Sequence, residues 1–475
     1  MKRLIKLFAL IMATAMTLTV AACGGNGKNS NQNGGDGYEE VFVSIVDAGF
    51  GSDWLEAVAA AYYEETGTVV SVSADPDIGN SVLTKMGTSA EKDDIYFCAQ
   101  APVLWRQWTY RGLIEPIDDV LSSNKYGTPA KDRAVDNTLL KTGTYYNKLY
   151  LTPYVYSNWG LIYNQNYLNQ IESYGEYEKG VWPETVQGLL DLCAATKAAK
   201  IVNSRTGRTV APFSCGLTVP YMNPLFYTLW YQLDPEGYDA YYAQNDKNDY
   251  QFESLQSEGV LKALETIYDL IGATSETESN LVSSSQNHLD SQNSFVNGDC
   301  VFISCGTWFE TEMDTILEQV GLTEYHYAAH PVYNKGDSKV SCVNIPGEFF
   351  FIPSDAINKE GAKDFLAFAM SDKGLAAASK KLNQPLAFKN EQEVELGRFG
   401  QEIMTVINNS EKIYRYSDTD VGKTGALDLF MLDVSPFISF AKYKITSKKD
   451  IYEKVIAAEI TVHQQRWKDY IQYIE

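Results

Sequence analysis

Beyond residue 40 the chain alternates short apolar runs of strand length with stretches of helical periodicity. In the first part the predicted strands are 41–48 (VFVSIVDA), 68–74 (TVVSVSA) and 94–100 (DIYFCAQ), and the predicted helices are 53–67 and about 81–88. Strands that alternate with helices in this way predict a parallel sheet covered by helices.

A second set of elements begins after the period-two run 149–164 (LYLTPYVYSNWGLIYN), which is long enough to carry the chain from one lobe into another. The later predicted elements are a helix at 181–199 that opens at Pro183, strands at 324–334 and 343–356, an amphipathic helix at 361–381 and a long helix at 450–475. Some 440 residues exceed what one core usually organises, so two lobes are expected.

The stretch 291–313 (SQNSFVNGDCVFISCGTWFETEM) predicts the end of a helix, a turn at Asn297 and Gly298, and a strand at 301–304. Gly306, Thr307 and Trp308 stand at the end of that strand. Such a tryptophan is either a core residue or a stacking platform, because ligands of open α/β sheets bind outside the carboxyl ends of strands.

The N-terminus carries Lys2, Arg3 and Lys6 ahead of an apolar run, which is typical of a signal peptide over residues 1–22. Val-Ala-Ala-Cys at its end resembles the bacterial lipoprotein processing box, in which the cysteine, here Cys23, receives the lipid. Residues 24–37 (GGNGKNSNQNGGDG) are small and polar, as expected of a tether.

The charge balance argues against one class of partner. The full chain carries a formal net charge of −22, and removing the signal segment takes three cations and no anions, which leaves −25. A surface this acidic repels phosphate backbones, so nucleic acid is excluded as a partner.

Motifs of catalysis and metal binding are missing. The four histidines show no paired ligand spacing, and the chain has no nucleophile elbow and no nucleotide glycine fingerprint, so we predict no metal and no cofactor. The six cysteines after Cys23 contain no C-x-x-C pair and are expected to be mostly free thiols. With 61 acids, the paired carboxylates of a glycoside hydrolase remain open.

Aromatic residues with a polar edge are abundant, since the chain holds 32 Tyr and 8 Trp. A sugar ring presents an apolar C–H face and a rim of hydroxyls, and a protein that binds it needs flat aromatic surfaces bordered by polar groups. Most of these residues are still expected to be ordinary core or surface aromatics.

Four segments together resemble a known family. LYLTPYVYSNWGLIYNQNYL, VWPETVQGLLDLCAATK, FVNGDCVFISCGTW and AKDFLAFAMSDKGL, in this order and spacing, look like the extracellular solute-binding proteins of bacterial carbohydrate ABC importers, the maltose-binding-protein-like family. The resemblance runs from about Glu40 to the C-terminus.

The resemblance implies an α/β fold of the class II periplasmic-binding-protein-like type, with two lobes, each a sheet covered by helices, and ligand in the cleft between them. The implied boundaries are 1–22 for the signal peptide, 23–39 for the lipidated cysteine and tether, 40–154 plus 343–371 for the first lobe, and 155–342 plus 372–475 for the second.

The resemblance also implies ligand contacts. The family's Gly-x-Trp ends a strand that faces the cleft, so Trp308 is the first-choice contact. The other positions that match family cleft positions are Tyr221, Trp159, Ser157, Tyr154, Asp53, Gln100 and Glu348. Asp53 is either a helix cap, paired with Glu56 in a capping box, or a sugar ligand, or both. Ala101 and Pro102 stand where the maltodextrin binder has charged contacts, which argues against maltose.

The sequence therefore predicts a non-catalytic, monomeric, lipid-anchored receptor on the outer face of the bacterial cell membrane. It would close on a mono- or oligosaccharide and deliver it to the permease subunits of an ABC importer. Two alternatives remain at this point: a secreted glycan-active hydrolase, or the same fold binding a non-sugar solute such as a polyamine, which would want several acids in the cleft.

Overall fold

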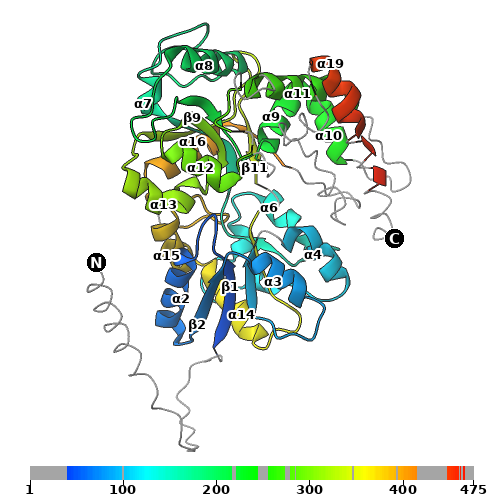
Figure 1. Ribbon diagram of the computed structural model, residues 1–475. Coiled ribbons are helices and arrows are strands. Elements are labelled where there is room, and N and C mark those ends of the chain that lie inside the picture. The colour runs from blue at the N-terminus through cyan, green and yellow to red at the C-terminus, as the bar shows by residue number, and fades with distance from the viewer. Residues whose placement is uncertain are drawn as a thin grey trace, which may run out of the picture. The chain divides into compact units, whose positions relative to one another are not determined.

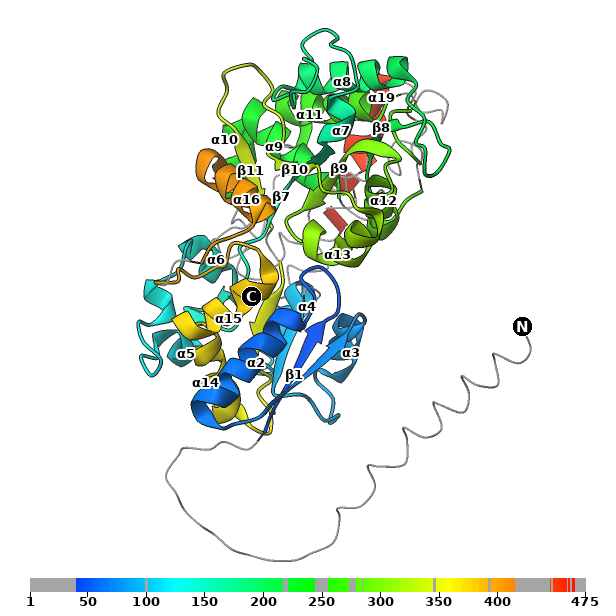
Figure 2. The same ribbon diagram turned by 90° about the vertical axis from the view of Figure 1, so that its left-hand side faces the viewer.

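Each lobe is built around one large sheet, and the sheet of the first lobe contains the first three strands of the chain (Figures 1 and 2). The structure, a computed structural model, describes residues 40–465 except 99–100, 217–220, 244–254, 273–278, 284, 345–346, 392–393, 415–444, 446, 459 and 462–463. The strand order is β2 (Val70–Asp75), β1 (Val41–Val46), β3 (Ile95–Cys98), β12 (Phe349–Phe351) and β6 (Thr152–Pro153). β1 pairs in parallel with β2 and β3, as the alternation of strands and helices predicted, whereas β12 runs antiparallel to β3.

The side chains of this sheet alternate between two apolar cores, as the period-two geometry of a strand requires. Val43 and Phe97 face the core that contains Trp54 of α2 (Asp53–Thr66). Tyr96 and Phe351 face the opposite core, which contains Trp105 of α4 (Ala101–Tyr110). Helices therefore cover both faces of the sheet.

The remaining elements around this sheet are short. They are α3 (Ile78–Lys85), α5 (Asp118–Ser122), the 3₁₀ turn η1 (Ala130–Asp132), α6 (Asn137–Thr142), the hairpin of β4 (Thr144–Tyr145) and β5 (Lys148–Leu149), α14 (Lys359–Ala369) and α15 (Asp372–Leu382).

The chain returns to the second lobe for the last time later than predicted, after α15 and not before it. We assigned residues 372–475 to the second lobe, but α15 lies beside α2 in both views, and Lys373 pairs with Glu65 at 2.6 Å (Figures 1 and 2). The predicted helix 361–381 is in fact two helices, because Ser371 caps a new one through the N–H of Gly374.

The second sheet has the order β13 (Glu411–Ile413), β11 (Val340–Val343), β7 (Asn158–Asn164), β9 (Cys300–Gly306) and β8 (Ala211–Ser214), and β10 (Tyr325–Ala328) also pairs with β7. The helices of this lobe are α7 (Gln165–Leu168), α8 (Val186–Ala199), α9 (Asn223–Leu233), α10 (Pro235–Ala243), α11 (Glu258–Ile271), α12 (His288–Val296), α13 (Phe309–Val320), α16 (Arg398–Asn409) and α19 (Lys448–Asp450), followed by the π-helical turn η4 (Ile451–Ile456). Half of the predicted helix 450–475 lies outside the described residues, and the described part begins with this π-helical turn.

Within the described part of the chain, three segments cross between the two lobes. The first runs from β6 to β7, as the period-two pattern predicted. The second runs from β11 to β12, so the predicted strand 343–356 is two strands in two different sheets. The third runs from α15 to α16, and it lies beside the first, because the N–H of Tyr156 donates to the carbonyl of Pro385 at 2.9 Å.

One helix cap differs from the prediction. Ser52, not Asp53, precedes the first helical residue of α2, and no side chain caps this end, so the capping box of Asp53 and Glu56 is wrong. The other end is as predicted: Gly67 has φ 76°, and its N–H donates to Tyr63.

The six cysteines within the described residues are free and buried, as expected of small apolar side chains in strands and helices.

Candidate ligand-binding site

Three aromatic side chains from distant parts of the sequence meet at the end of β9. The ring centroids of Trp308 and Trp159 are 4.6 Å apart with an interplanar angle of 88°. Tyr221 stands 4.9 Å from Trp159 and 6.2 Å from Trp308, again nearly perpendicular to both. This set, which we call the aromatic cluster, presents flat surfaces at right angles to one another.

The backbone around β9 sets the positions of these rings. Trp308 is the residue before α13, and its indole lies over Gly306, where an added Cβ would come within 2.0 Å of the ring. Only glycine permits this approach. The carbonyl of Tyr221 accepts a hydrogen bond from Ser304 of β9 at 2.8 Å, and the indole N–H of Trp159 donates to Asn344 at 3.0 Å.

The first lobe touches the cluster through the loop that follows β1. Phe50 packs edge-on to Trp308, with 6.3 Å between centroids. The N–H of Gly49 donates to Oε1 of Glu312, on α13 of the second lobe, at 3.2 Å. The aromatic cluster therefore lies where the two lobes meet, and separating them would uncover it.

Two carboxyl groups border the same loop. Glu312 accepts a second hydrogen bond, from Gln292 at 2.6 Å. Glu348 stands directly before β12, and its Oε1 would be 3.0 Å from a Cβ added at Gly49. Part of Glu348 is exposed, but its Oε2 is buried and has no hydrogen-bond partner among the described residues.

Burial and a like charge shape the protonation of these groups. Removal of its carboxyl from water, with a smaller effect from the nearby Glu312, raises the pKa of Glu348 from 4.5 to about 8. Burial also raises the pKa of Tyr221 well above its ordinary value. At neutral pH the site thus holds a neutral phenol and a largely protonated Glu348.

The structure brings together most of the predicted contacts. Trp308 and Trp159 are each 8% exposed, and Tyr221 is partly buried. Ser157 lies on the first crossing segment, with its hydroxyl close to Gly347, beside Glu348. These positions stay predicted ligand contacts.

Two predicted contacts lie elsewhere, and one is outside the described residues. Tyr154 is fully buried inside the first lobe: its ring stacks on Trp54 at 4.6 Å, and its hydroxyl donates to the carbonyl of Ala369 at 3.0 Å. Tyr154 is therefore a core residue, because its ring is packed and its hydroxyl is hydrogen-bonded inside the first lobe. Asp53 is exposed at the start of α2, and Gln100 is not described.

Sequence reasoning missed Glu312 and Asn344, and it matched the loop 49–54 to a family cleft position without singling out Phe50. Glu312 had a usable signal, since it follows Trp308 by four residues and so shares its face of α13. Phe50 belongs to the loop after the first predicted strand, where its aromatic ring could have been noticed. Nothing local marked Asn344, whose role depends on the pairing of β11 with β7.

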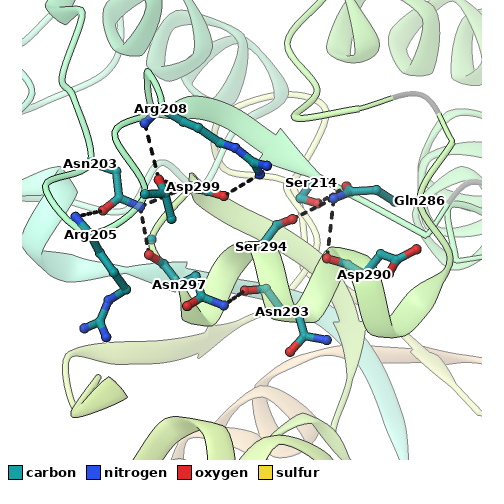
Figure 3. A network of polar contacts seen from close by, with 12 residues as sticks. Asn203, Arg205, Arg208, Ser214, Gln286, Asp290, Asn293, Ser294, Asn297 and Asp299 are labelled. Carbon is teal, nitrogen blue, oxygen red and sulfur yellow. Dashed lines mark hydrogen bonds and ion pairs between the residues drawn. The ribbon is translucent and has the colours of Figure 1, made fainter. Parts of the chain in front are cut away.

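A hollow of about 1040 Å³ lies on the second lobe beside β8 and α12. Figure 3 shows the polar network of residues that line or border it. Its buried acid, Asp299, accepts hydrogen bonds from Asn203 at 2.8 Å and Thr206 at 2.5 Å, and pairs with Arg208 at 3.0 Å. Because these partners already satisfy the carboxylate, the network stabilises the fold of this lobe rather than awaiting a ligand.

Metal binding and membrane insertion find no support in the described part of the chain. Its His, Cys, Asp and Glu side chains form no group of three that could hold a metal ion. None of its helices has both the length and the apolar character to cross a bilayer. The Asp246–Asp249 segment, which faintly resembles a calcium loop, lies outside the described residues.

The comparisons with known proteins define the class. A model of the bacterial extracellular solute-binding protein family matches residues 57–395. The chain belongs to this family, and it is a binding protein rather than an enzyme, which removes the hydrolase alternative. The family places it outside the cytoplasmic membrane.

Among solved structures, the GacH receptor of Streptomyces glaucescens GLA.O, determined unliganded and with acarbose or an acarbose homolog, superposes with a TM-score of 0.66. The match covers 91% of this chain and 99% of that one at 14% identity, and it shows the shared two-lobe fold. No curated protein sequence matched the chain.

Proposed function

We propose that this protein binds a mono- or oligosaccharide between its lobes. The observation that carries the proposal is the aromatic cluster at the lobe contact, with Trp308 at its centre. Rings at right angles can stack on one sugar face and border another, while carboxyl groups and Asn344 meet the hydroxyls. The GacH receptor, which was solved with acarbose and compared with an acarbose-loaded maltose binding protein, supports the same ligand class.

Binding on this proposal shifts the population from open to closed lobes. A ligand that touches both lobes prefers the closed form, in which Gly49 and Phe50 lie against Glu312 and Trp308. Changing the ratio of closed to open from 1:99 to 99:1 takes about 5.5 kcal/mol of differential affinity. A few stacked rings and charge-assisted hydrogen bonds supply energy of this order.

A screen by thermal shift tests the ligand class. A glycan present at about 100 times its dissociation constant adds about 2.7 kcal/mol to the free energy of unfolding, and so raises the melting temperature. We expect at least one mono- or oligosaccharide in a broad panel to do this, whereas amino acids and small peptides should not. A panel in which only non-sugar solutes shift the melting temperature would contradict the proposal.

We further propose that the receptor works as a monomer at the outer face of the cell membrane, held by lipid on Cys23, and passes its ligand to the permease subunits of an ABC importer. The support is the Val-Ala-Ala-Cys box followed by a small, polar tether. Cys23 and the tether lie outside the described residues.

Replacing Cys23 with alanine is expected to release the protein from the membrane fraction, because no lipid can then be attached. The matched control is Cys193→Ala, which removes a buried thiol of α8 and should leave the protein in the membrane fraction. Fractionation and mass spectrometry of the N-terminal peptide provide the measurement. Membrane retention of Cys23→Ala, with no lipid mass on the wild-type peptide, would count against the anchor.

A further inference from the structure

We propose that the ligand carries a positively charged amino group, which binds between the carboxyl groups of Glu348 and Glu312 while the rest of the ligand contacts the aromatic cluster. This inference rests on the proposed binding site and narrows its ligand class from a neutral saccharide to an amino-substituted one. A linear polyamine is the other source of the same chemistry.

The first argument is an unsatisfied acceptor. Buried polar side chains in folded proteins almost always have hydrogen-bond partners, so one without a partner calls for an explanation. Oε2 of Glu348 is buried and unpartnered within the described residues, at the point where the first lobe meets Trp308. A ligand donor at this position would remove the cost of leaving it unsatisfied.

The second argument is the sign of the charge around it. Gly49 borders both carboxyl groups: its N–H donates to Oε1 of Glu312 at 3.2 Å, and a Cβ added at this glycine would lie 3.0 Å from Oε1 of Glu348. Among the described residues, no Lys, Arg or His side chain forms an ion pair with either group, and Glu312 is the charged group that acts on Glu348. An ammonium group would supply the missing cation and allow Glu348 to ionise beside Glu312.

The third argument concerns the aromatic rings of the site and the net charge of the protein. The faces of Trp and Tyr rings attract cations, and this attraction is strongest where water is excluded, as it is around Trp308 and Trp159. The formal charge of −22 also draws cations toward the protein over longer distances. Neutral hydroxyls would gain from neither effect.

Binding exchanges a proton for the ammonium group. In the free protein, burial and Glu312 hold a proton on Glu348 at neutral pH, since they raise its pKa to about 8. When the ammonium enters, this proton leaves to the solvent, and the carboxylate pairs with the cation. The protein thus gains one negative charge for each ligand bound, the ammonium group balances this charge, and one proton is released to the solvent.

The experiment compares ligands that differ only in this group. Glucose, glucosamine and N-acetylglucosamine, their β-1,4-linked oligomers, and spermidine are titrated calorimetrically in two buffers of different ionisation enthalpy. Titrations are run at about pH 6.5, where the amines are charged. We expect the amino form to bind at least about tenfold more tightly than its neutral counterparts and to release about one proton.

Glu348→Gln keeps the shape of the side chain and removes its ability to ionise. We expect this variant to lose the preference for the amino form and the proton release. The matched control is Glu318→Gln, which removes one exposed charge from α13 and should retain both. Melting curves confirm that each variant is folded.

The outcomes separate the two proposals. Neutral sugars that bind as tightly as amino sugars would overturn the ammonium site and leave the saccharide function standing. Binding of spermidine but of no sugar would overturn the saccharide function and leave the ammonium site standing. Preference for the amino form that survives in Glu348→Gln would overturn the assigned role of this residue. No binding by any of the amines would overturn the ammonium site, and the broad glycan panel decides the saccharide function separately.

Discussion

Replacing Trp308 with alanine is expected to weaken ligand binding about 10- to 150-fold. The stacked indole contributes on the order of 1.5 to 3 kcal/mol through buried apolar area, and alanine removes this contact. The indole forms the centre of the aromatic cluster and makes edge contacts with Trp159, Tyr221 and Phe50. Calorimetric titration of the folded variant measures the loss, and the wild-type tryptophan fluorescence should change when ligand enters.

The matched control for this prediction is Trp230→Ala. Trp230 is fully buried on α9 of the same lobe, so its removal leaves a cavity that costs about 3 to 5 kcal/mol of stability. We expect this variant to melt at a much lower temperature but to bind ligand with near-normal affinity in its folded fraction. If Trp308→Ala behaves like this control, Trp308 is a packing residue, and its stacking role is wrong.

Replacing Glu348 with glutamine is expected to stabilise the protein in alkaline solution and to leave it unchanged in acid. In the folded protein the pKa of Glu348 is raised to about 8 by burial and by Glu312, whereas in the unfolded chain it is close to 4.5. Between these values the folded state holds a proton that the unfolded state has lost. The stabilising contribution of Glu348 is therefore complete below about pH 4.5 and is lost as the pH rises toward 8.

The expected difference is about 2 to 4 kcal/mol, since each tenfold change in proton affinity is worth about 1.4 kcal/mol and the partial exposure of Glu348 reduces the full value. Denaturant unfolding of both proteins at about pH 4.5 and about pH 8.5 measures it. Glu318→Gln is again the control and should show no such pH dependence. Equal stability of wild type and Glu348→Gln at both pH values would show that Glu348 ionises normally.

Local patterns predicted the elements that position the site. Short apolar runs located β1, β3 and β9, and helical periodicity that ends at Gly67 located α2. These patterns suffice because a strand covered on both faces is a short, nearly continuous apolar run, whereas a helix that buries one face repeats its apolar residues every three to four positions.

The wrong predictions concern segments whose local pattern fits two different tertiary arrangements equally well. The apolar run 343–356 has the composition of one strand, but the chain crosses between sheets within it, and only the pairing of β11 with β7 and of β12 with β3 reveals this. Likewise, α15 is amphipathic whichever lobe it covers. Its packing against α2 depends on the tertiary structure, and the local sequence pattern does not predict it.

The sequence by itself determined that Trp308 follows a buried strand and that aromatic residues are plentiful, which was enough to suggest a site. The tertiary structure decided which of them meet. Trp159, Tyr221 and Trp308 form one cluster because β7 and β9 are neighbours, and a hydrogen bond to β9 holds the backbone at Tyr221. Tyr154, which matched the same family pattern, is instead enclosed in the core. The raised pKa of Glu348 is also a tertiary property, because burial and the approach of Glu312 depend on how distant segments pack.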